Sequence, residues 1–186
     1  MRTSTLFAST LWAATVLAHG EVTSPPTRQP GPVMQQVCGA AAVNAILADT
    51  TGPLESIKSN GAADCNIFMC KGAQFEDNQA NVQAFAPGEV VPLTATLPIP
   101  HEGPCNVSII DTATNTAVGA PLLVFDSYAD ENLAQLPANN TAFSVTMPAN
   151  LGTQCQVPGE CTMQWFWFGT SAVQTYESCV DFVMTA

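Results

Sequence analysis

Basic side chains are scarce in this sequence. Four lysines and arginines stand against fifteen aspartates and glutamates, and the formal net charge is −11. A surface of this kind repels nucleic acid and anionic membranes, so we expect neither as a partner. A neutral polysaccharide is not repelled in this way.

Long apolar runs are absent after the first eighteen residues, so nothing there is long enough to span a bilayer. The stretch Met1–Ala18 has a basic residue, Arg2, then an apolar run and a small residue at its end. This order is typical of a secretory signal peptide. We therefore expect cleavage after Ala18, export from the cell, and one domain over residues 19–186.

No CxxC pair occurs among the seven cysteines, which argues against a zinc site. In an oxidising compartment such cysteines are expected to form disulfides. Cys65 and Cys70 are close enough in sequence for a local bridge, and so are Cys155 and Cys161. The sequence leaves the connectivity open, but the odd number means that one cysteine is left over.

Helix signals are also few. The proline-rich segment 23–32 predicts an extended strand or arm, and the alanine-rich segment Cys38–Asp49 is the only convincing helix. Alternating apolar residues bounded by Gly, Pro, Asn or Asp predict strands. These strands are expected at Glu89–Leu97, Cys105–Asp111, Ala142–Met147, Cys161–Phe168 and Gln174–Met184. The pattern predicts an all-β fold, an antiparallel sandwich of immunoglobulin or fibronectin III type with long loops and one short helix.

Two sequons, at Asn106 and Asn139, predict N-glycosylation on surface turns of an exported glycoprotein.

Only two histidines are present, and signal cleavage would make His19 the N-terminal residue. A free terminal amine has a pKa near 8 and can give up its proton to a metal. His19 would then offer an amine and an imidazole, and His101, in a turn between two predicted strands, would offer a second imidazole. Three nitrogens in a tetragonal arrangement favour Cu(II). We therefore predict copper as the cofactor and His19 and His101 as its ligands.

The sequence also resembles a known family along the whole mature chain. His19–Arg28 resembles the mature start of lytic polysaccharide monooxygenases, and His101–Asp111 resembles the segment with their second copper histidine. Gln164–Phe168 and Tyr176–Asp181 resemble their last two core strands. The likeness is greatest to small fungal proteins with a chitin-binding type-4 domain. It implies that His19 and His101 form a "histidine brace" on copper.

The resemblance is incomplete around the metal. The family often has a Tyr or Phe beside the copper, and here the candidates are Phe182, Met184 and Tyr176. A Glu or Gln that steers oxygen species is also typical, which makes Gln164 the catalytic candidate. A polar residue that faces water is the alternative for Gln164.

The absence of a clear aromatic platform weakens an enzymatic interpretation. Trp165 and Trp167 alternate on one strand, which favours the core over a platform for sugars. Asp181 is interpreted as structural, although a carboxylate ligand would favour copper storage or delivery over oxidation.

Three functions follow as hypotheses. The first is oxidative cleavage of glycosidic bonds in chitin, cellulose or a fungal wall glucan by a secreted monomer. The second is binding to such a polysaccharide without cleavage, and the third is copper handling outside the cell. A Cys105–His101 nucleophile is a weaker alternative.

Overall fold

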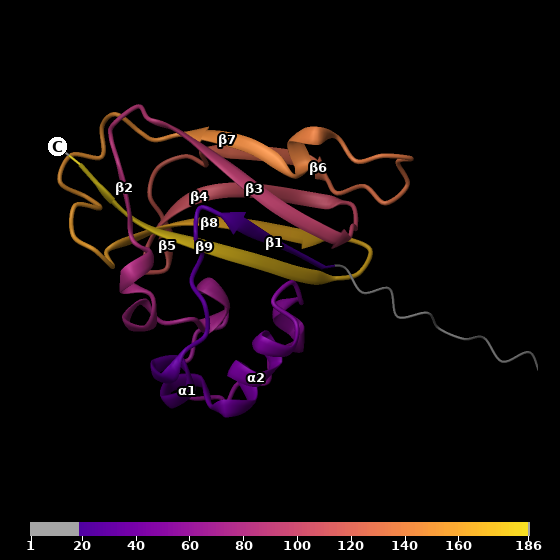
Figure 1. Cartoon of the computed structure of the whole chain (residues 1–186), viewed down its shortest axis with the longest axis horizontal. Helices are drawn as coiled ribbons and strands as arrows, with labels where there is room; N and C mark the ends of the chain where they lie inside the picture. Colours follow the sequence, from indigo (N-terminus) through magenta and orange to yellow (C-terminus); the bar gives the residue numbers. More distant parts are fainter. Residues whose placement is uncertain (1–18, 186) are drawn as a thin grey trace, which may run out of the picture.

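Two β-sheets face each other in the computed structural model, which describes residues 19–185 (Figure 1). The smaller sheet has the order β1-β3-β7, and the larger has the order β2-β9-β8-β4-β5 with β6 also paired to β4. The smaller sheet comprises β1 (His19–Ser24), β3 (Val90–Ile99) and β7 (Ala142–Thr146). The larger comprises β2 (Gln83–Phe85), β4 (Gly103–Asp111), β5 (Thr116–Ala117), β6 (Leu123–Tyr128), β8 (Cys161–Gly169) and β9 (Gln174–Met184). All pairs are antiparallel except β2 with β9.

This arrangement confirms the expected β-sandwich, and the five predicted strands are present with small shifts at their ends. The strands β2, β5 and β6 were not predicted, since they are short or lack clear alternation. The signal peptide expected at residues 1–18 lies outside the described residues.

The main core lies between the two sheets and follows from the period-two alternation of the strands. Trp165 and Trp167 point into it from β8 and are 1% and 0% exposed. Their placement confirms that they belong to the core. Tyr128 packs edge-on against the Trp167 ring, with the ring centroids 5.8 Å apart. Tyr176 stacks on the same ring, with the centroids 4.5 Å apart.

A helical region covers the outer face of the larger sheet beside β9 (Figure 1). It contains α1 (Pro32–Cys38), α2 (Ala40–Ala48) and the short 3-10 turns Leu54–Ser56, Cys70–Gly72, Phe75–Asp77 and Gln79–Asn81, and another such turn, Ala138–Asn140, precedes β7. The region has its own apolar cluster, which includes Met34, Val43 and Ile46.

The expectation of a single helix was wrong, because a second helix, α1, begins at Pro32, the last residue of the segment expected to be extended, and ends at Cys38. Pro32 occupies the start of α1, where its missing N–H is not needed. The Asp77 carboxylate accepts hydrogen bonds from the amides of Val33 and Met34, at 3.0 and 2.9 Å. Gly39, at φ 89°, separates α1 from α2 in a conformation that favours glycine.

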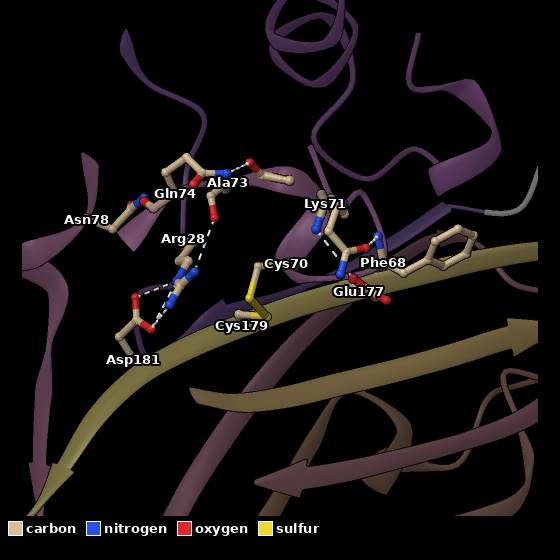
Figure 2. Close-up of a disulfide and its surroundings, with 12 residues drawn as sticks. Arg28, Phe68, Cys70, Lys71, Ala73, Gln74, Asn78, Glu177, Cys179 and Asp181 are labelled. Carbon is tan, nitrogen blue, oxygen red and sulfur yellow. Dashed lines mark hydrogen bonds and ion pairs between the residues drawn. A yellow bond between two sulfur atoms is a disulfide. The ribbon is translucent and has the colours of Figure 1, made fainter. Parts of the chain in front are cut away.

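Three disulfides join Cys38 to Cys65, Cys70 to Cys179, and Cys155 to Cys161. Of the two local bridges that the spacing allowed, the one between Cys155 and Cys161 is present and the one between Cys65 and Cys70 is not. Cys70–Cys179 instead ties the helical region to β9 (Figure 2). Cys105 is the cysteine left over, and it is buried.

The two sequons lie in different settings. Asn139 is exposed in the turn before β7. Asn106 lies within β4, paired with Val124 on one side and Phe166 on the other. The expectation of a surface turn therefore does not hold for Asn106, which lies within the strand that the sequence predicted at Cys105–Asp111.

No helix within residues 19–185 has the length and apolar character needed to cross a membrane.

Candidate metal centre

His19 begins β1 and pairs with Ile99 at the end of β3. Its Nε2 lies 2.7 Å from Oδ2 of Asp49, and the two side chains are 14% and 42% exposed. A ring that shares an Nε2 proton with a carboxylate carries its lone pair on Nδ1. Nδ1 is the nitrogen that can close a chelate ring with the backbone amine of the same residue.

Asp49 follows the last residue of α2 and is fixed by its own turn. Its Oδ1 accepts hydrogen bonds from the amide and hydroxyl of Thr51, at 3.1 and 2.8 Å. Partial burial would raise the pKa of Asp49, but the bonds from Thr51 and the contact with His19 lower it below its usual value. The carboxylate is therefore ionised at neutral pH and holds the imidazole in one orientation.

His101 lies between β3 and β4 and is only 2% exposed. Both of its ring nitrogens are buried without a hydrogen-bond partner among the described residues. Buried polar atoms nearly always have a partner, and leaving one unpaired costs about 1–3 kcal/mol. A bound metal would supply the missing partner, so the donor set fits a copper ligand.

The strand register brings the two histidines to the same end of the sandwich. His101 follows Ile99, the partner of His19, by two residues. A Cβ placed on Gly20 would lie 3.0 Å from the Trp167 ring, and one on Gly169 would lie 3.3 Å from Cβ of His101. The ends of β3 and β8 and the starts of β1 and β9 meet at this end in Figure 1.

The three residues that the sequence offered as the side chain beside the metal lie at different ends of β9. Tyr176 is near the start of the strand, and its hydroxyl donates to Oε1 of Gln174 at 2.7 Å. Phe182 packs against Phe85, about 20 Å further along the strand, and Met184 follows it. Only Tyr176 is therefore at the histidine end. Burial raises the pKa of its hydroxyl, which keeps the phenol protonated.

Gln164 lies in the middle of β8, paired with Ser108 and Cys179. It faces away from the Trp165 side and precedes Gly169 by five residues, which is about 17 Å along a strand. It is buried, and its Nε2 has no hydrogen-bond partner among residues 19–185. The structure therefore does not bring Gln164 to the histidines.

Asp181 forms a buried bidentate pair with Arg28, whose Nε and Nη2 donate to it at 2.7–3.0 Å. This contact supports the structural interpretation of Asp181. Cys105 is buried, and burial raises the pKa of its thiol well above the usual value. A thiol held protonated in this way is a poor nucleophile.

Carboxylates also flank His101. The amide of Glu102 donates to Oε2 of Glu131 at 2.6 Å, and the nearby His101 contributes to lowering the pKa of Glu131. Burial, which has the largest influence on the pKa of Glu131, acts to raise it, but the pKa remains below its usual value. The surroundings of this end are thus acidic, which favours a cation.

Within the described part of the chain, no group of three or more His, Cys, Asp and Glu side chains is arranged to hold a metal ion. A centre at this end would therefore need the backbone amine of His19 as a donor. Sequence reasoning missed Asp49 as the partner of His19, because Asp49 follows a helix thirty residues along the chain and no motif surrounds it.

Comparison with known proteins gives structural matches only. No protein-family model matches the chain, and a search of curated proteins finds no match either. An AA10 lytic polysaccharide monooxygenase from Streptomyces lividans has a TM-score of 0.52 and 13% identity, over 89% of this chain and 99% of that one. A chitin-binding domain from Burkholderia pseudomallei has a TM-score of 0.48 and 13% identity, over 90% and 100%. A Jonesia denitrificans lytic polysaccharide monooxygenase has a TM-score of 0.44 and 20% identity, over 90% and 100%. The match to the Streptomyces lividans protein shows that the chain has the fold of a lytic polysaccharide monooxygenase, as its sequence resemblance led us to expect.

Proposed function

We propose that this chain is a secreted copper-binding protein. Cleavage after Ala18 would free the amine of His19, and this amine, Nδ1 of His19 and the His101 imidazole would hold the metal. The observation that carries the proposal is His101, whose two buried ring nitrogens have no hydrogen-bond partner among the described residues. The three disulfides support an oxidising compartment for the protein.

Asp49 has a supporting role in this proposal. Metal-binding histidines usually donate their other ring N–H to a carboxylate, which fixes the tautomer and makes the ring a better donor. The 2.7 Å contact between Nε2 of His19 and Asp49 has this form. Asp49 thereby presents Nδ1 of His19 beside the amine and adds negative charge near a cation.

Copper handling is favoured over cleavage of a polysaccharide. Bound copper would supply one-electron redox chemistry in either case. However, no tryptophan or tyrosine within residues 19–185 is exposed to stack on a sugar ring. Gln164 also lies far along β8 from the histidines. The described residues are therefore better suited to binding copper than to binding a polysaccharide on an aromatic surface.

Oxidative cleavage of glycosidic bonds is the second candidate. It is supported by the shared fold with the Streptomyces lividans enzyme, over nearly the whole of both chains. The substrate class would be a neutral polysaccharide such as chitin, cellulose or a wall glucan, which the acidic surface does not repel. The protein would act as a monomer in this case.

The test uses protein whose first residue is His19, titrated with Cu(II) by calorimetry and followed by electron paramagnetic resonance. We expect one tight site with three nitrogen donors. His101→Ala should lose most of the affinity and change to a two-nitrogen spectrum, and one extra residue before His19 should weaken binding as strongly. Equal affinity in all three proteins would refute the site.

Product analysis separates the two functions. Copper-loaded protein is incubated with a reductant, an oxidant and chitin, cellulose or glucan. Oxidised oligosaccharides that disappear in His101→Ala would establish cleavage. Copper binding without such products would count against cleavage of these polysaccharides and favour copper handling.

A further inference from the structure

Lys71 is one of three basic residues in the chain after position 18, and it is buried, with 8% exposure. Its Nζ donates a hydrogen bond of 2.6 Å to the backbone carbonyl of Thr50. Burial lowers the pKa of this ammonium, and the nearby Glu21, Glu177 and Asp49 counteract the effect. A buried charge is costly unless it is paired, so an apolar residue would fill this space at lower cost.

The backbone around Lys71 has an unusual conformation. Cys70 and Lys71 have φ angles of 56° and 59°, which non-glycine residues rarely adopt. The disulfide from Cys70 to Cys179 holds this turn against β9, and Figure 2 shows Lys71 and Glu177 beside it. The amide of Lys71 also lies 3.4 Å from Oε2 of Glu177. The turn is therefore anchored to the larger sheet.

Thr50 lies in the loop that carries Asp49. The hydroxyl of Thr50 donates to Oε1 of Glu21 at 3.0 Å, and the carbonyl of Thr51 accepts from the amide of Gly20 at 2.9 Å. Both partners belong to β1, the strand that begins with His19. Lys71 thus contacts this loop at the Thr50 carbonyl, while β1 contacts it through Gly20 and Glu21, the two residues that follow His19.

We propose that Lys71 is a positioning residue for the copper centre. Through the Thr50 carbonyl it holds the loop of residues 49–52 against β1, and this fixes the Asp49 carboxylate at Nε2 of His19. The inference rests on the proposed function and adds a residue that is not one of the proposed copper ligands. An ammonium is needed here because Thr50 offers a carbonyl, which accepts a hydrogen bond that an apolar side chain cannot give.

The test replaces Lys71 with methionine, which has a similar length and no charge. Lys58→Met is the matched control, since Lys58 is the other lysine and is exposed. If the single variant fails to fold, the double variant Lys71→Met/Glu177→Gln is used instead. It removes the Glu177 charge, which would otherwise be buried without the Lys71 ammonium beside it. Cu(II) affinity, the paramagnetic spectrum and the amide hydrogen exchange of Gly20 in the copper-free protein are measured.

We expect about a tenfold loss of Cu(II) affinity, at the low end of what supporting residues of metal sites contribute. We also expect an altered spectrum and faster exchange of the Gly20 amide, with Lys58→Met unchanged. Wild-type affinity, spectrum and exchange in a folded Lys71 variant would overturn the inference. If the wild-type protein binds no copper, the proposed function fails, and the exchange of Gly20 still decides whether Lys71 holds the loop.

Discussion

The buried carboxyl of Glu177, which neighbours Lys71, should make the stability of the protein depend on pH. Its side chain is 2% exposed on β9, and burial raises its pKa from 4.5 to about 7, against the opposing influence of Lys71. The folded state thus binds the proton more tightly than the unfolded chain. Stability is complete below about pH 4.5 and falls as pH rises towards the folded pKa near 7.

The magnitude follows from the two pKa values. One pKa unit corresponds to about 1.4 kcal/mol, so ionising Glu177 costs the folded state about 3 kcal/mol between pH 4 and pH 8. Glu177→Gln removes this titration and keeps the shape of the side chain. The free energy of unfolding of the variant, relative to wild type, should therefore rise by about 3 kcal/mol over this range.

The assay is urea unfolding of wild type and Glu177→Gln at several pH values from 4 to 8. Glu76→Gln is the control, because Glu76 is exposed and the variant loses the same charge. Its difference from wild type should stay within about 0.5 kcal/mol, as for other surface substitutions. A difference for Glu177→Gln that does not change with pH would show that this carboxyl titrates normally, and would refute the reasoning.

Two further predictions concern Asp49 and Cys105. Asp49→Asn should weaken Cu(II) binding about 10–100-fold in a calorimetric titration, because it removes the negative partner of His19. It should change stability by less than about 1 kcal/mol, since the pair is partly exposed, and unchanged affinity would count against the supporting role. Cys105 should not react with a thiol reagent in the folded protein at pH 8, because it is buried with a raised pKa. One thiol per chain should appear after unfolding, and rapid labelling of the folded protein would contradict the burial.

Several contacts of the structure lie beyond what local sequence patterns can indicate. The helix α1 has no capping side chain of its own, and Asp77, more than forty residues away, binds its first amides instead. Cys70 pairs with Cys179 across 109 residues, although the nearby Cys65 was also within reach by sequence spacing. In both cases the partner is selected by the way distant segments pack, and a sequence window contains no signal for it.

The resemblance to a family located His19 and His101, but left their neighbours open. Tyr176, Phe182 and Met184 follow one another on a single strand and differ only in which end of it they occupy. The register of β9 against β8 places Tyr176 at the histidine end of the strand, opposite Trp167, and Phe182 and Met184 at the other end. The same register places Gln164 in the middle of β8.

By itself, the sequence determined the alternation of the strands, the burial of Trp165 and Trp167, the odd cysteine and the two candidate ligands. These depend on residue type and on spacing over a few residues, which act before the chain folds. Only the tertiary structure decided that His101 is buried without a hydrogen-bond partner within residues 19–185, that Asp49 contacts His19, and that Lys71 donates to the Thr50 carbonyl. Burial and ion pairing depend on which distant segments come together, so these features exist only once the two sheets and the helical region have packed.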